Sequence, residues 1–311
     1  MRLASLVLAC CAALAAVSTA CAAPQIRYFM QPQNAACSET PYGANAPAGH
    51  YVQTADARIY YETYGSGEPV LVLHGGGVGT PYEMGAIIDR LRKRYAVTVM
   101  STRGHGRSEI GSAPLCLEQK AEDALAVLKA VTKRPARIIG FSDGGFTALA
   151  LAARHPDAVD RIAVIGAGTL KKGFFPADSL HVADIEKLDK AFLDQQRRLM
   201  PEPGKLQEFW TAYMNFWNKT EVGKDLLSSI RCPVLLIAGD EDDHAPVATV
   251  LQAHEWIPNS RLCIVPKAWH TAFLDNFAVT WAAIEPFVAA KSSALKPSKK
   301  VPANSDFTLS R

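Results

Sequence analysis

Residues 137–156, RIIGFSDGGFTALALAARHP, join a short apolar run to a helix-like run through a glycine-rich turn. At the centre, Gly140, Ser142 and Gly144 form the pattern G-x-S-x-G. When a strand turns directly into a helix, side chains two residues either side of the serine would collide, so glycine fits both places. A serine among glycines is weak evidence alone, but this strand–turn–helix context predicts a nucleophile elbow with Ser142 at its tip.

The surrounding sequence alternates between strand-like and helix-like segments, as in an α/β fold. Apolar runs rich in Val, Ile and Leu alternate with amphipathic, helix-like segments from about residue 50 to residue 290. Continuous apolar strands between helices indicate a parallel sheet that is buried on both faces. The stretch YVQTADARIYYETYG (51–65) instead alternates around a turn and predicts a strand hairpin.

The segment 171–228 interrupts this alternation, because it is far longer than an ordinary connection between two strands. They contain helical runs at 184–199 and 205–217, so we predict a helical cap inserted into the sheet domain. Four aromatic residues recur there at helical spacing. We expect some of them to pack the cap on the core and others, Trp210 and Trp217, to line a substrate pocket.

A serine hydroxyl is a poor nucleophile until a base takes its proton, and the base is usually a histidine oriented by a carboxylate. In the topology predicted here, the acid and then the histidine follow the serine, each after a later strand. His270 follows the last apolar run, RLCIVPKAWH, and is the predicted base.

The preceding strand ends in an acidic loop, GDEDDHAP. We choose Asp242 as the acid, since it lies three residues past the strand-ending Gly239. Asp240 is expected to hold the turn through hydrogen bonds to the backbone. Asp243 and His244 are the less favoured acid and base.

A negatively charged intermediate needs hydrogen-bond donors. The first parallel strand ends in LVLHGGG, where Gly76 and Gly77 let the backbone approach a substrate closely. We predict an oxyanion hole built from a backbone N–H group of this glycine loop together with the N–H of Asp143, with Gly77 and Asp143 also contacting substrate. His74 is expected to be structural and hydrogen-bonded beneath this loop.

Taken in order, the motifs HGGG, RGHGRS, GFSDGG, GDEDDHAP and AWH resemble those of serine hydrolases of the α/β-hydrolase fold, over residues 50–290. Within that superfamily the chain is similar to the valacyclovirase or biphenyl-hydrolase-like group and to bacterial esterase relatives. The resemblance implies an eight-stranded, mostly parallel sheet with a cap after the sixth strand. It also implies the following site residues: Ser142 as nucleophile, Asp242 as acid, His270 as base, and Gly76 with Asp143 as oxyanion hole.

One position departs from the family pattern. Ser101 stands two residues before the Arg of the RGHG loop, where the family often has Asp, so the hydrogen bonding of that loop is open.

The identity of the nucleophile limits the chemistry. Related enzymes with an Asp nucleophile form alkyl esters, whereas Ser142 would form an acyl-enzyme that water hydrolyses, without a metal or organic cofactor. We therefore expect a hydrolase of a small-molecule carboxylic ester. Alternatives with the same machinery are a lactonase, a perhydrolase, a C–C bond hydrolase and an aminopeptidase. A binding protein that kept the fold without turnover is a further alternative.

Asp143, directly after the nucleophile, has two explanations. A carboxylate there interacts favourably with the positive N-terminal end of the following helix, and this interaction stabilises the fold by about 0.3–1 kcal/mol. The resemblance to amino-acid-ester hydrolases suggests instead that Asp143 attracts a cationic group, giving a preference for amine-bearing substrates.

The two ends of the chain differ in composition from the central part. Residues 1–22 have a positive start, an apolar run and small residues for cleavage, which predicts a signal peptide and export to the periplasm or medium. Lipid attachment at Cys21 is the alternative; Ser18 stands where bacterial lipoprotein sites usually carry Leu, which favours cleavage. Residues 23–49 are predicted as an extended lead-in and 291–311 as a disordered basic tail.

Composition narrows the classes of partner. The net charge of +3 is too small to indicate a nucleic-acid partner, and the leader is too short for a stable membrane span. The sequence leaves oligomeric state open.

Four cysteines lie outside the leader: Cys37, Cys116, Cys232 and Cys263. Their spacing matches no metal-binding pattern. In an exported protein two of them could form a disulfide, but the sequence does not specify which two.

Overall fold

The computed structural model describes residues 26–33 and 37–291. The predicted signal peptide and the predicted tail after residue 291 lie outside these ranges. Inside them, no helix combines the length and the apolar character needed to cross a bilayer. The four cysteines after the leader are free thiols in the structure: Cys37, Cys116, Cys232 and Cys263.

The centre of the fold is an eight-stranded sheet with the order β1-β2-β4-β3-β5-β6-β7-β8. β2 runs antiparallel to both of its neighbours, and all later pairings are parallel. The fold expected from the sequence, a mostly parallel sheet entered through a hairpin, is confirmed. The strands are β1 (Gly49–Gln53), β2 (Arg58–Tyr64), β3 (Glu68–Leu73), β4 (Tyr95–Met100), β5 (Ala136–Phe141), β6 (Val159–Ile165), β7 (Val234–Gly239) and β8 (Ser260–Val265).

Helices cover both faces of the sheet, which is why its central strands are apolar throughout. One core forms between the sheet and α2, α3 and α7, and a second forms between the sheet and α1, α8 and α9. The α-helices are α1 (Gly85–Leu91), α2 (Leu117–Val131), α3 (Asp143–Arg154), α4 (Val182–Leu199), α5 (Leu206–Lys219), α6 (Lys224–Ser229), α7 (Val247–Trp256), α8 (Ala272–Asp275) and α9 (Phe277–Ala289). Short 3₁₀ helices are η1 (Ala46–Ala48), η2 (Pro81–Met84), η3 (Pro156–Ala158) and η4 (Pro203–Lys205).

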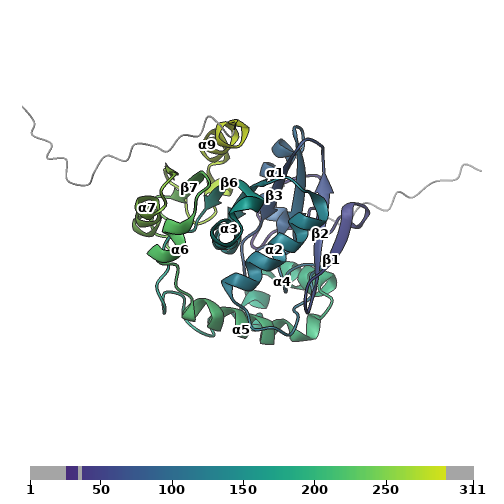
Figure 1. Ribbon diagram of the computed structural model, residues 1–311. Coiled ribbons are helices and arrows are strands. Elements are labelled where there is room, and N and C mark those ends of the chain that lie inside the picture. The colour runs from purple at the N-terminus through teal and green to yellow at the C-terminus, as the bar shows by residue number, and fades with distance from the viewer. Residues whose placement is uncertain (1–25, 34–36, 292–311) are drawn as a thin grey trace, which may run out of the picture.

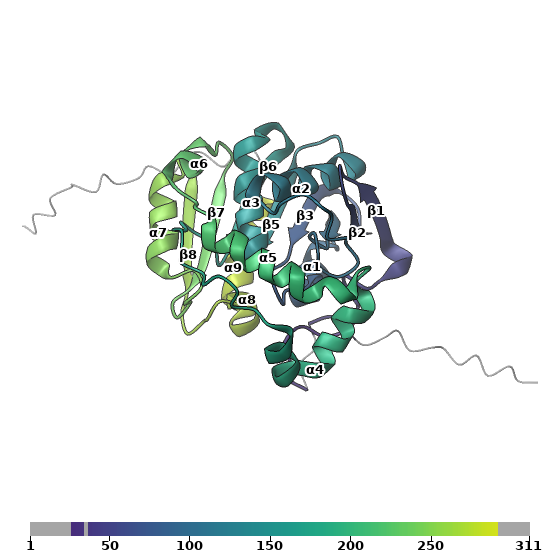
Figure 2. The same ribbon diagram turned by 90° about the horizontal axis from the view of Figure 1, so that it is seen from below.

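The long insertion between β6 and β7 contains α4, α5 and α6. Figure 1 shows α5 along the lower side of the molecule, at the opposite end from α9, and Figure 2 shows α5 crossing in front of the central strands. α6 packs against α3 and α7, so it extends the layer that covers the sheet. The cap over the carboxyl ends of the strands therefore consists of α4 and α5.

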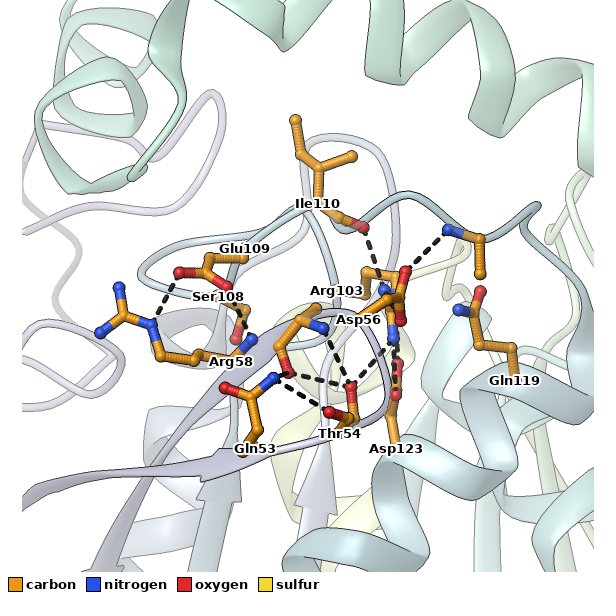
Figure 3. Close-up of polar contacts among 12 residues, drawn as sticks. Gln53, Thr54, Asp56, Arg58, Arg103, Ser108, Glu109, Ile110, Gln119 and Asp123 are labelled. Atoms are coloured by element: carbon orange, nitrogen blue, oxygen red, sulfur yellow. Dashed lines mark hydrogen bonds and ion pairs between the residues drawn. The ribbon is translucent and has the colours of Figure 1, made fainter.

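The loop after β4 is fixed by a buried arginine (Figure 3). The guanidinium of Arg103 makes two 2.9 Å hydrogen bonds to the carboxylate of Asp123 in α2 and a 2.9 Å ion pair with Asp56 in the β1–β2 turn. Ser101, the position that departs from the family pattern, keeps its hydroxyl buried without a hydrogen-bond partner among the described residues. Its backbone carbonyl accepts a 2.7 Å hydrogen bond from the hydroxyl of Ser108. Arg103 and Ser108 therefore hold this loop.

Candidate active site

Ser142 lies in a strained turn between β5 and α3. Its φ of 50° and ψ of −115° fall outside the regions that non-glycine residues ordinarily adopt. The turn is held by a 2.8 Å hydrogen bond from the N–H of Ser142 to the carbonyl of Ile165 in β6. A Cβ at Gly140 would lie 2.3 Å from the carbonyl oxygen of Gly144, and a Cβ at Gly144 would lie 2.4 Å from the carbonyl oxygen of Leu73, so both positions require glycine.

Three side chains from separate turns meet at the carboxyl edge of the sheet. Nε2 of His270, after β8, lies 2.9 Å from Oγ of Ser142. Nδ1 of the same ring lies 2.9 Å from Oδ2 of Asp242, after β7. The structure thus brings together the predicted nucleophile, base and acid, with each ring nitrogen of His270 facing the group that its role requires.

Asp242 is held as a carboxylate. It is 4% exposed, and Oδ1 accepts hydrogen bonds of 2.9 Å and 2.8 Å from the N–H groups of His244 and Ala245. Burial raises the pKa of this carboxyl, but the hydrogen bond and charge of His270 and the two N–H groups outweigh burial and leave the pKa below its usual value. A carboxylate at this position can orient His270 and would stabilise an imidazolium if the ring took up a proton.

The neighbouring acids are engaged elsewhere. Oδ1 of Asp240 accepts a 3.2 Å hydrogen bond from the N–H of Ala268, and exposed Asp243 pairs with Nδ1 of His244 at 2.6 Å. Asp242, Asp243 and His244 lie close enough to hold a metal ion. Because the oxygens of Asp242 already accept hydrogen bonds from two backbone N–H groups and His270, we assign this cluster to hydrogen bonding.

The predicted oxyanion donors, the N–H groups of Gly76 and Asp143, belong to residues that lie close together and line the same cavity as Ser142. Asp143 is the first residue of α3, so its N–H has no partner within the helix, whereas the next N–H, of Gly144, donates to the carbonyl of His74 at 3.1 Å. A Cβ at Gly76 would lie 2.9 Å from Cβ of Asp143 and would overlap the hydroxyl of Tyr213. The two backbones therefore approach closely, and only glycine fits at Gly76.

His74 supports this loop from below, as expected. Its Nδ1 contacts the carbonyl of Gly75, and its Nε2 accepts a 3.0 Å hydrogen bond from the N–H of Thr102. Burial lowers the pKa of His74 to about 3, so the ring is neutral at ordinary pH. A neutral ring that accepts at Nε2 fixes the loop after β3 to the loop after β4.

Asp143 has a partner that was not among the residues predicted from the sequence, Lys120. The Lys120 ammonium lies 2.9 Å from Oδ2 of Asp143, and the side chains are 3% and 2% exposed. The same ammonium faces the rings of Tyr213 and Phe216 at 5.4 Å and 6.0 Å from their centroids. The signal was available: Lys120 falls on the apolar face of α2, three residues after Leu117, where a charged residue needs a partner.

A cavity of about 300 Å³ opens over Ser142 beneath the cap. Gly77, Asp143 and Trp217 line it, as predicted, together with apolar side chains from α3 and the cap. Trp210 does not line it and instead lies buried in the core. Trp210 and Trp217 share a helix face, but they are seven positions apart along α5, a rise of about 10 Å, and only the Trp217 end lies beside Phe146 and Ser142.

Comparison with known proteins agrees with this geometry. Residues 68–203 match the family described as alpha/beta hydrolase fold. The chain is 25% identical to human serine hydrolase BPHL over 236 residues, 71% of this chain and 80% of that protein. It is 27% identical to the pimeloyl-[acyl-carrier protein] methyl ester esterase of Neisseria meningitidis, over 70% of this chain and 93% of that protein. A solved structure of CarC, a serine hydrolase involved in carbazole degradation, superposes with a TM-score of 0.66 at 20% identity, covering 78% and 99% of the two chains.

Proposed function

We propose that this chain, which is similar to hydrolases of the α/β-hydrolase fold, cleaves a carboxylic ester or a related acyl bond through an acyl-enzyme on Ser142. The observation that carries the proposal is the continuous hydrogen-bonded chain from Asp242 through His270 to Ser142. A strained elbow and a glycine loop beside that chain support acyl transfer in particular.

The proposed reaction has two halves. His270 Nε2 accepts the proton of Ser142 as Oγ bonds to the acyl carbon, and the oxyanion binds the N–H groups of Gly76 and Asp143. His270 then passes that proton to the leaving oxygen as the carbon–oxygen bond breaks. Water, deprotonated by His270, attacks the acyl-enzyme, and the proton returns to Ser142 as the acid is released.

For the acyl group, we propose a neutral and largely apolar chain. The cavity beneath the cap is lined by Val78, Phe146, Leu180 and Met214, and its one carboxylate, Asp143, is already paired with Lys120. A preference for amine-bearing substrates through Asp143, as the sequence suggests, would require a carboxylate without this internal cation. We therefore expect neutral acyl groups to be better substrates than aminoacyl groups.

The test combines labelling with a substrate panel. The purified chain should react with a fluorophosphonate at Ser142 and should hydrolyse p-nitrophenyl esters of neutral acids. Ser142→Ala should abolish labelling and reduce kcat by at least about 10⁴-fold, with an unchanged circular dichroism spectrum. Wild-type protein that is neither labelled nor active on esters, lactones or amides would leave only the binding-protein alternative.

We also propose that the protein is exported after removal of residues 1–22. The mass of the mature N-terminus, measured on protein from a bacterial host, tests this. A lipid-modified Cys21 or a retained leader would each contradict it.

A further inference from the structure

A second cavity, of about 600 Å³, also opens onto Ser142. We call it the His270 cavity, because His270 and the following Thr271 line it and neither lines the cavity beneath the cap. Ser142 and Gly76 border both cavities. A substrate bonded to Ser142 therefore has two directions in which its two halves can extend.

The position of His270 decides which half lies where. In the acylation half-reaction, Nε2 of His270 must hand its proton to the leaving oxygen, so that oxygen must lie on the histidine side of Ser142. The alcohol half then extends into the His270 cavity, and the acyl half extends beneath the cap. This assignment rests on the proposed function.

The outer wall of the His270 cavity comes from an unexpected part of the chain. Tyr28, Phe29 and Met30 line it, although the sequence predicts only an extended lead-in there. The N–H of Met30 donates to Oδ2 of Asp189 in α4 at 2.8 Å, and the guanidinium of Arg27 pairs with the same oxygen at 2.9 Å. The wall is thus anchored on the cap.

Further contacts make the attachment specific. The side-chain amide of Gln195 both accepts from the N–H of Arg27 and donates to its carbonyl, each at 2.9 Å, in the two-point pattern of paired strands. The ring of Phe29 packs edge-to-face on Phe192, with centroids 5.5 Å apart. Three residues of α4, spaced along one side of the helix, therefore hold this segment.

α4 is interrupted at the anchor. Asp189 has φ −153° and ψ 76°, which is not helical, and its Oδ1 accepts a 3.1 Å hydrogen bond from the N–H of Phe192. Asp189 is 7% exposed, so its carboxylate is buried between the two halves of the helix and the N-terminal segment. One carboxylate therefore caps the second half of α4 and fixes the wall of the cavity.

We propose that residues 28–30, anchored through Asp189, form the outer wall of the leaving-group subsite, and that this subsite selects bulky, uncharged alcohols. Tyr28, Phe29 and Leu274 offer apolar surface to such a group. The carboxylate of Asp275, also in the lining, repels an anionic alcohol. The volume of the cavity, twice that beneath the cap, suits a leaving group larger than the acyl chain.

The test uses two ester series. One keeps the acyl group and varies the alcohol from methyl to naphthylmethyl, and the other keeps the methyl alcohol and varies the acyl group. Asp189→Ala should lower kcat/KM for the naphthylmethyl ester roughly tenfold and leave the methyl ester within about twofold, since it removes apolar contact from the alcohol side alone. The control is Asp184→Ala, an exposed acid of the same helix, which should change neither series.

Three further measurements distinguish the proposed subsite from a general loss of cap structure. Tyr28→Ala trims one wall side chain without touching the anchor and should show the same selective loss. When alcohols compete with water for the acyl-enzyme, transfer to naphthylmethanol should fall relative to methanol in both variants. Asp275→Asn should improve esters of carboxylate-bearing alcohols only, because it removes the repelling charge.

The outcomes separate this inference from the proposed function. Equal losses for methyl and naphthylmethyl esters, or losses confined to the acyl series, would overturn the leaving-group subsite while leaving the ester hydrolase in place. No ester turnover and no fluorophosphonate labelling of the wild-type protein would overturn both.

Discussion

Two turns at the carboxyl edge of the sheet each place a buried carboxylate beside Ser142, and each carboxylate has a different basic partner. Asp242, after β7, holds His270, which contacts the nucleophile. Asp143, after β5, holds Lys120, which faces aromatic rings of the cap. The same residue type therefore has two kinds of partner: Asp242 orients the proposed catalytic base, whereas Asp143 pairs with a buried ammonium and ties the elbow to α2.

The largest difference between the two turns should appear in turnover. Asp242→Asn should lower kcat about 10⁴-fold, because an amide favours the wrong tautomer of His270 and no longer stabilises the imidazolium. Thermal unfolding should show that the fold survives. Asp240→Asn and Asp243→Asn are matched controls from the same loop, and a comparable loss in either would move the role of acid away from Asp242.

Breaking the Lys120–Asp143 pair at the turn after β5 should mainly lower the free energy of unfolding. Lys120→Met removes the ammonium that pairs with Asp143, and breaking a buried ion pair from one side costs about 3–5 kcal/mol of unfolding free energy. A lone anion beside the oxyanion site should also lower kcat, by less than Asp242→Asn does. Urea unfolding and steady-state kinetics measure the two effects.

The double variant Lys120→Met with Asp143→Asn tests whether Lys120 stabilises the fold through its charge or through its packing. It leaves no buried charge at this pair of positions, so it should recover most of the stability that Lys120→Met loses. A double variant as unstable as the single one would show that Lys120 contributes through packing on Tyr213 and Phe216 rather than through its charge. Gain of aminoacyl-ester hydrolysis in Lys120→Met would show that the internal cation excludes amines from the cavity.

The comparison also explains what the sequence could and could not predict. Ser142, Asp242 and His270 follow from local turn chemistry and from the order of strands, both of which are written along the chain. The pairing of Lys120 with Asp143 joins residues 23 positions apart and depends on how α2 packs beside the elbow. Its only local sign is a lysine on an apolar helix face.

The cap and the lead-in were harder to predict for a related reason. Helical spacing places Trp210 and Trp217 on one face of α5 but does not say which end lies over Ser142. Composition alone predicts residues 23–49 as extended, whereas the attachment of Met30 to Asp189 spans 159 positions. Contacts between residues so far apart in sequence depend on how whole helices and segments pack together, and local sequence patterns do not predict that packing.

Another buried carboxyl, Glu83, has no basic partner among the described residues, and its predicted effect is on the pH dependence of stability rather than on turnover. Its Oε1 accepts a 2.8 Å hydrogen bond from the N–H of Gly75, beneath the glycine loop. Burial raises its pKa from 4.5 to about 8 against the pull of that N–H group, so the folded protein keeps this carboxyl protonated at neutral pH. Unlike Asp242 and Asp143, Glu83 should therefore act as a neutral hydrogen-bonding group.

Glu83→Gln tests this through the pH dependence of stability. Between pH 4.5 and about 8 the unfolded chain has lost the proton that folded Glu83 retains, so raising the pH through this window favours unfolding, by up to about 1.4 kcal/mol per pH unit. Glutamine does not titrate and keeps an acceptor for Gly75. Urea unfolding near pH 5 and near pH 8 should show the variant gaining stability relative to wild type as pH rises. Parallel curves for the two proteins would mean that Glu83 is ionised in the folded state, and that a carboxylate beneath the glycine loop is tolerated without the kind of basic partner that Asp242 and Asp143 both have.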